Sequence, residues 1–269
     1  MRTATREIAF VVLLSAGVIG ETIAQDSSPP ASAVPGARPG YLPTEFLRRQ
    51  AEGARQQALA SSKDVSATAW GDAQRKYALT LMILAEREDA EKNLNAALTH
   101  VQNAASVQAH DDDLVRWMRN EWARANIIAA FAKTGKMRER LDDAILAYRN
   151  VEREESAYMK LGEIRQQIIG FGQAVPGFPT WKTSPQPAPR DSFGWRQFYF
   201  DLGSALFDLA SMEKSRTILE QAVAAFQKSQ NAPPGLFDDD LLKKAEEKAS
   251  RVKALLDILE VGAQDRGRR

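Results

Sequence analysis

The stretch Trp195–Ser229, WRQFYFDLGSALFDLASMEKSRTILEQAVAAFQKS, carries the pattern that decides the fold. Small or apolar residues recur at helical spacing on both sides of the short charged segment Met212–Ser215. Because residues three or four positions apart share one face of a helix, this spacing predicts two helices joined by a tight turn. The pattern positions are Gly203, Leu206, Leu209, Ala210, Leu219, Ala222, Val223 and Phe226.

The same pattern occurs twice earlier in the chain, beginning at Trp70 and at Trp117. The first copy contains Ala78, Leu81, Leu84, Ala85, Leu94, Ala97, Leu98 and Val101. The second contains Ala125, Ile128, Phe131, Ala132, Leu141, Ala144, Ile145 and Tyr148. Such self-similarity is typical of repeat proteins, in which each repeat buries its apolar face against its neighbours. We therefore predict an all-α, helix-turn-helix solenoid of about three repeats.

The third copy resembles the tetratricopeptide repeat family. Residues that match the signatures of that family's two helices are Leu202, Gly203, Ala205, Leu206 and Leu209, then Ala222, Phe226 and Ser229. The two signatures lie about seven residues further apart than in the common 34-residue repeat, which indicates a longer-period variant. The resemblance implies a scaffold that binds other proteins, with no catalysis and no cofactor of its own.

The first 24 residues have the features of an export signal. Arg2 and Arg6 precede an apolar run from Ile8 to Gly20, and small residues follow it. The run is shorter than the roughly 20 residues that span a bilayer. We therefore expect cleavage near Ala24 rather than an uncleaved membrane anchor, and hence a periplasmic or secreted protein without a stable membrane span.

The rest of the chain divides into a linker, a repeat domain and a tail. Residues 25–43 contain closely spaced prolines that exclude helix, which predicts a disordered linker that is either a spacer or a passive leader. Residues 44–262 form the predicted repeat domain. Helices beginning at Thr44 and near Asp238 are expected to cap its two ends. Residues 263–269 are expected to form a flexible basic tail.

A long insertion separates the second and third copies. Trp70 and Trp117 lie 47 positions apart, whereas Trp117 and Trp195 lie 78 positions apart. The excess falls in residues 170–194, where several prolines exclude helix. Long loops in compact folds are usually functional or disordered. We expect this loop to be ordered along the solenoid, with three aromatic anchors, Phe171, Phe178 and Trp181. The functional interpretation of such a loop is a lid over the groove, and whether it covers the groove stays open at this point.

Charge and motifs argue against several classes of protein. Lys plus Arg total 36 against 35 Asp plus Glu, so no basic excess favours nucleic acid. The segment His110–Asp113 has metal-ligand residue types, but helix capping explains aspartates at a helix start. Gly135-Lys136 lacks the rest of a phosphate-binding loop. The chain has no cysteine and no hydrolase motif, so we expect a non-catalytic protein without a metal or cofactor.

The predicted partner-binding groove is lined, by analogy with the family, by first-helix residues that point away from the core. The candidates are Arg75, Arg119, Trp122, Asn126 and Phe200. An aromatic and arginine-rich surface suits peptide capture. The alternative is that Trp122 and Phe200 pack under a neighbouring helix. Five clustered aromatic residues are too many for one buried stripe, so some should face the loop or groove: Phe193, Trp195, Phe198, Tyr199 and Phe200.

Two functions follow from these features. The first is an exported scaffold that binds a protein or peptide partner in its concave groove. The alternative is an envelope polysaccharide-binding or enzyme-associated accessory subunit that uses the aromatic loop, because aromatic faces also stack on sugars. A response of tryptophan fluorescence to glycans is expected only from the second.

Cleavage of the signal is directly testable. Mass spectrometry of the protein from its native cell should show an N-terminus near Gln25, because signal peptidase requires small residues just before the cut. An intact Met1 in the membrane fraction would instead identify an anchor.

Overall fold

The computed structural model describes residues 43–111, 113–135, 137–160, 193–233 and 239–266, and within these ranges the fold is all-helical, without a strand. The helices there are α2 (Thr44–Ala60), α3 (Ala67–Ala85), α4 (Ala90–Ala105), α5 (Leu114–Gly135), α6 (Arg138–Arg153), α8 (Trp195–Glu213), α9 (Arg216–Asn231) and α10 (Asp239–Arg266). None of the helices described is long and apolar enough to cross a membrane.

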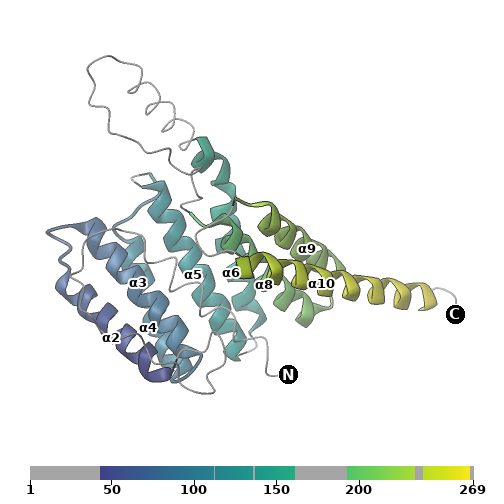
Figure 1. Cartoon of the computed structure of the whole chain (residues 1–269), viewed down its shortest axis with the longest axis horizontal. Coiled ribbons are helices and arrows are strands. Elements are labelled where there is room, and N and C mark those ends of the chain that lie inside the picture. The colour runs from purple at the N-terminus through teal and green to yellow at the C-terminus, as the bar shows by residue number, and fades with distance from the viewer. Residues whose placement is uncertain (1–42, 112, 136, 161–192, 234–238, 267–269) are drawn as a thin grey trace, which may run out of the picture.

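Each copy of the sequence pattern forms one pair of packed helices. The pairs are α3 with α4, α5 with α6, and α8 with α9. They lie side by side in chain order in Figure 1, with α2 against α3 at one end and α10 against α9 at the other. The predicted pairing of helices within each copy is therefore confirmed.

Capping residues determine where the first helices of the pairs begin. The Ser66 hydroxyl accepts a hydrogen bond from a backbone N–H at the start of α3. Asp113 does the same at the start of α5, where its Oδ1 accepts from the Arg116 N–H at 3.0 Å. Such caps satisfy N–H groups that lack a partner inside the helix. Consequently α3 and α5 begin ahead of Trp70 and Trp117, the residues at which the sequence predicted their starts.

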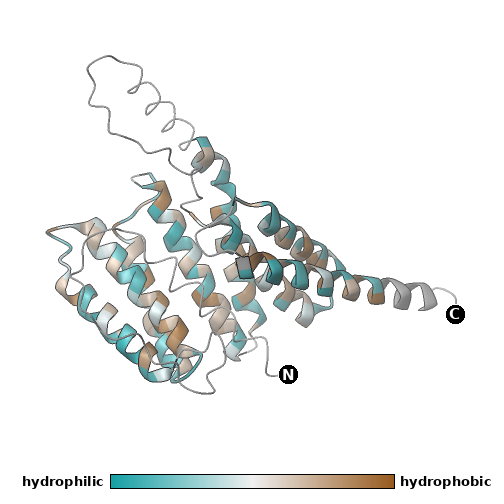
Figure 2. Ribbon diagram, in the orientation of Figure 1, coloured by the Kyte–Doolittle hydropathy of each residue, from teal (hydrophilic) through white to brown (hydrophobic). Residues whose placement is uncertain are grey.

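The buried apolar residues form two clusters that share α5. One cluster joins α2, α3, α4 and α5, and the other joins α5, α6, α8, α9 and α10. In α5, Ile127 and Phe131 belong to the first cluster, and Ile128 and Ala132 to the second. Both apolar and polar residues are distributed along each helix (Figure 2). Each pair thus depends on its neighbours to bury its apolar residues.

Small residues permit the closest contacts within the pairs. Ala97, Ala144 and Ala222 are all fully buried, as expected for positions where helices approach closely. At Gly203 in α8, an added Cβ would lie 2.9 Å from Cδ1 of Phe226 in α9. Glycine therefore lets the Phe226 ring approach the backbone of α8 this closely.

The prediction that some of the five clustered aromatic residues face the loop or groove is wrong. All five are buried, with exposed fractions between 0% for Trp195 and 4% for Phe193. The reason is that α8 packs against α6, α9 and α10 together, so more than one of its faces is covered. A helix that is covered on several sides can bury aromatic residues on more than one face.

Some of the boundaries predicted from the sequence agree with the helix bounds of the structure, and others do not. Helix α2 begins at Thr44, as expected, whereas α10 continues to Arg266, past the boundary predicted at residue 262. The first residues of the expected tail 263–269 are therefore helical. The signal peptide, the linker up to residue 42 and most of the loop 170–194 lie outside the described residues, and so do the three loop anchors Phe171, Phe178 and Trp181.

Two glycines provide a matched test of the contact between α8 and α9. Gly203→Ala should destabilise the fold by about 1–3 kcal/mol, because the new methyl group meets the Phe226 ring. Gly53→Ala is the control, since an added Cβ at this position in α2 meets nothing within 4 Å. Its higher helix propensity should stabilise the fold by about 0.5–1 kcal/mol. Urea unfolding followed by circular dichroism measures both, and equal effects would contradict the packing described.

Candidate functional site

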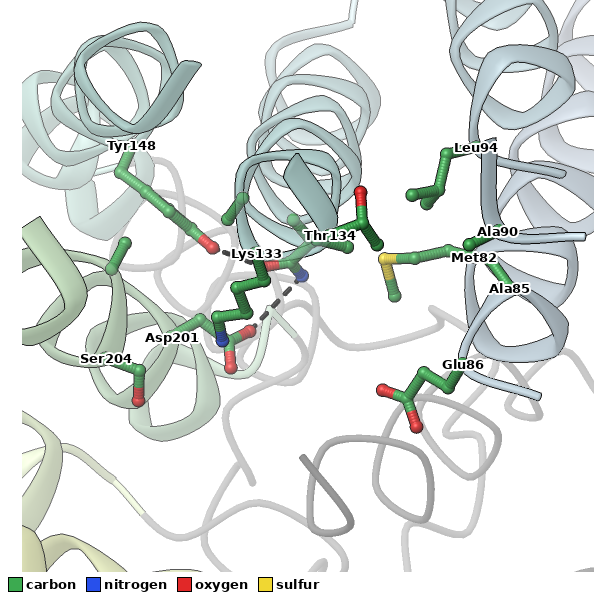
Figure 3. A pocket seen from close by; sticks show the side chains of 14 residues that line it. Met82, Ala85, Glu86, Ala90, Leu94, Lys133, Thr134, Tyr148, Asp201 and Ser204 are labelled. Carbon is green, nitrogen blue, oxygen red and sulfur yellow. Dashed lines mark hydrogen bonds between the residues drawn. The ribbon is translucent and has the colours of Figure 1, made fainter. Parts of the chain in front are cut away.

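A cavity of about 450 Å³ lies where the three pairs meet. Its volume falls in the range of pockets that hold small molecules or side chains. Helices α3, α5 and α8, the first members of the pairs, supply most of the walls, and α4 and α6 supply the rest (Figure 3). The lining residues are Met82, Ala85, Glu86, Ala90, Leu94, Asn126, Ala129, Ala130, Lys133, Thr134, Tyr148, Asp201, Ser204 and Ala205.

The carboxylate of Asp201 in α8 is the most deeply buried charged group in this lining, with 5% of the residue exposed. Its Oδ2 accepts hydrogen bonds from Trp122 Nε1 at 3.0 Å and from Asn126 Nδ2 at 3.2 Å. Its Oδ1 accepts one from Gln197 Nε2 at 2.6 Å. Burial raises the pKa of Asp201 to about 6, although these bonds and the nearby Lys133 act to lower it.

Asn126 links Asp201 to α6. The Tyr148 hydroxyl of α6 donates a hydrogen bond to Asn126 Oδ1, while the amide nitrogen of Asn126 donates to Asp201. Because burial raises the pKa of Tyr148, its hydroxyl keeps its proton at neutral pH. The chain from Tyr148 through Asn126 to Asp201 therefore fixes polar groups from α6, α5 and α8 relative to one another.

Two further hydroxyls and one ammonium group in the lining are also engaged. Thr134 Oγ1 donates to the Phe131 carbonyl at 2.7 Å. Ser204 Oγ donates to a carbonyl of its own helix at 2.8 Å and accepts from Lys248 Nζ at 3.0 Å. The ammonium of Lys133 forms an ion pair with Asp208, at 3.1 Å from Oδ2.

Glu86 is the second carboxylate of the cavity, at the C-terminal end of α3. Its side chain is exposed, yet the surrounding walls partly exclude water and raise its pKa to about 7, against the effect of Arg87 and Lys133. No hydrogen bond or ion pair engages this carboxylate in the part of the chain that the structure describes. Figure 3 shows Glu86 apart from the group formed by Tyr148, Lys133 and Asp201.

The structure brings together only part of the predicted partner-binding set. Asn126 lines the cavity, and Trp122 is joined to it through Asp201 while its ring packs on Phe193 at 5.5 Å. Arg119 lies on the same helix but is not part of the cavity lining. The grouping of Trp122 with Asn126 therefore follows the helical spacing from which it was predicted.

Arg75 and Phe200 lie away from the cavity. Arg75 belongs to a network between α3 and α5, where it donates to Asp72 at 2.8 Å and to Asn120 at 3.1 Å. Burial lowers its pKa, while Asp72 acts in the opposite direction. Phe200 is 3% exposed and packs against the Phe226 ring at 5.8 Å, so the alternative of packing against a neighbouring helix is correct for this residue.

Sequence reasoning missed Asp201, Glu86 and Tyr148 as lining residues. Tyr148 was assigned to the core pattern, where it is buried, and its hydroxyl still reaches the cavity. Asp201 carried a usable signal, since it is an acidic residue directly between Phe200 and Leu202 in a segment rich in apolar residues. Buried charges of this kind are rare unless they are paired or hydrogen-bonded.

No known protein family matches this chain, and neither the curated proteins nor the solved structures contain a significant match. Among the described residues, no group of three or more His, Cys, Asp or Glu side chains is arranged to hold a metal ion. The geometry of the cavity is therefore the basis on which a function is proposed.

The raised pKa of Asp201 predicts a specific pH dependence of stability. Between about pH 4 and pH 6 the folded protein binds a proton at Asp201 that the unfolded chain releases. The free energy of unfolding should therefore rise as the pH falls through this window. Relative to Asp201→Asn, which cannot titrate, the wild type should gain about 2 kcal/mol between pH 7 and pH 4.5. Urea unfolding at both pH values measures this gain, and parallel pH profiles would contradict it.

Proposed function

We propose that this chain is an exported, non-catalytic scaffold that binds a protein or peptide partner at the cavity between α3, α5 and α8. The observation that carries the proposal is the cavity itself, about 450 Å³ in volume and walled by the first helices of all three pairs. Mostly apolar pockets with a few fixed polar groups are typical of binding sites. Export is inferred from the first 24 residues alone.

The architecture supports a scaffold of the tetratricopeptide type with a longer repeat. Three packed pairs follow one another in the chain, and α2 and α10 cover the first and last of them. In such stacks the first helices line a continuous inner surface, which is the usual place for a bound segment. The first helices α3, α5 and α8 contribute most of the lining of the cavity.

Preorganisation of the polar lining also favours binding. Asp201 and Asn126 are held by hydrogen bonds between α8 and α5, and the Tyr148 hydroxyl joins them from α6. Groups that are already ordered lose little conformational entropy when a partner binds. Trp122 donates to the same carboxylate from outside the lining and so helps to hold Asp201 in place.

The alternative, a polysaccharide-binding accessory subunit, depends on Phe171, Phe178 and Trp181. These residues lie outside the described part of the chain, and no feature of the described cavity favours stacking on sugars. The partner-binding scaffold is therefore the function that the geometry supports best.

Site-specific photocrosslinking in the native cell tests this proposal. A benzophenone amino acid replacing Ala90, which is partly exposed and lines the cavity, should crosslink to a distinct protein partner. The matched control is the same replacement at Leu146 in α6, which is 59% exposed and does not line the cavity.

Adducts that form at position 90 and are absent at position 146 are the expected result, identified by mass spectrometry. Identical adducts at both positions, or none at position 90, would argue against a partner at this cavity. Circular dichroism of both proteins checks that the replacements leave the fold intact.

A further inference from the structure

The hydroxyl groups that line the cavity present acceptors to it. The Tyr148 hydroxyl donates its hydrogen bond to Asn126, and the hydroxyls of Thr134 and Ser204 donate theirs to backbone carbonyls. A hydroxyl whose single proton is already used has only oxygen lone pairs left to offer. At these three hydroxyl groups a ligand meets hydrogen-bond acceptors and has to supply the donors.

The charged residues of the lining also favour a ligand group that carries donors. Glu86 and Asp201 are carboxylates, and Lys133 is the cationic member of the lining. Since the Lys133 ammonium is held by Asp208, it does not neutralise Glu86 in a direct ion pair. A cationic ligand group gains from the Glu86 carboxylate, whereas an anionic one is opposed by it.

The remaining walls are apolar and suit an unbranched hydrocarbon stem. They comprise Met82, Ala85, Ala90, Leu94, Ala129, Ala130 and Ala205. The many alanines leave room along the walls, and the flexible thioether of Met82 adapts to the shape of what it contacts. Long basic side chains combine such a stem with a charged, donor-rich head.

We propose that the cavity binds a cationic, donor-bearing group on an unbranched apolar stem, which in a protein partner is a Lys or Arg side chain. The Glu86 carboxylate pairs with the charged head. The stem lies along the alanines of α5. The assignment of the ligand to a protein side chain rests on the proposed function, since a free amine has the same chemistry as the head of a Lys side chain.

Three small probes of equal length test the chemistry of the cavity on the purified full chain. They are n-pentylamine, n-pentanol and pentanoate, which differ in charge and share an apolar stem. Binding is followed by NMR through the methyl group of Met82, which lines the cavity and is assigned with Met82→Leu. Pentylamine should bind about tenfold more tightly than pentanol, and pentanoate should bind most weakly.

Two variants show whether Glu86 is the residue responsible. Glu86→Gln should reduce the preference for pentylamine over pentanol by about tenfold, because the neutral amide cannot pair with the ammonium. Glu91→Gln is the control, since Glu91 is an exposed acidic residue of α4 outside the lining, and its preference should equal that of the wild type. A free energy of unfolding lower than that of the wild type would show that a variant disturbs the fold.

The outcomes separate this inference from the proposed function. Equal affinities for the three probes, or a preference that survives Glu86→Gln, would overturn the inference even where crosslinking identifies a partner. Selective binding of pentylamine without a crosslinked protein would keep the cation site and assign it to a free amine. Absence of any probe binding together with absence of crosslinks would overturn both.

Discussion

The buried carboxylate of Asp201 is the interaction on which the candidate site depends. Transfer of a charged group into the interior is costly unless hydrogen bonds compensate for lost hydration. Here three donors do so, two of them from α5, the helix that belongs to both core clusters. The same bonds fix Asn126, whose Oδ1 in turn accepts a hydrogen bond from the Tyr148 hydroxyl. The arrangement of Trp122, Asn126 and Tyr148 around the cavity therefore depends on one carboxylate.

Packing of α8 is what makes that burial possible. Gly203 allows the Phe226 ring of α9 to approach the backbone of α8, and α6 and α10 cover other parts of the same helix. With its apolar faces covered in this way, α8 presents Asp201, Ser204 and Ala205 to the cavity. Packing against the neighbouring helices leaves one side of α8 to line the cavity. Asp201 and Ser204 lie on that side.

Much of the fold was predictable from local pattern, and the site only in part. Apolar spacing correctly predicted the helix pairs, since it reports which face of a helix is buried. It does not report how many neighbours a helix has, which is why all five aromatic residues around α8 are buried against expectation. Helix starts depended on Ser66 and Asp113, whose caps lie ahead of the repeated pattern.

Long-range partners explain what the sequence did not reveal about the site. Trp122 and Asn126 were grouped correctly because they share one helix face, but their bonds to Asp201 span 79 and 75 positions of the chain. Periodicity within a helix carries no information on such pairs. For Phe200, burial under α9 could not be separated from exposure until the neighbouring helix was placed.

The central claim is that the cavity selects a cation because its lining offers acceptors and carboxylates. The most direct measurement is a crystal structure of the protein with n-pentylamine bound. We expect the ammonium nitrogen within hydrogen-bonding distance of the Glu86 carboxylate and the alkyl stem along Ala129 and Ala130. A ligand bound outside the cavity, or one whose ammonium points away from Glu86 toward solvent, would contradict the account.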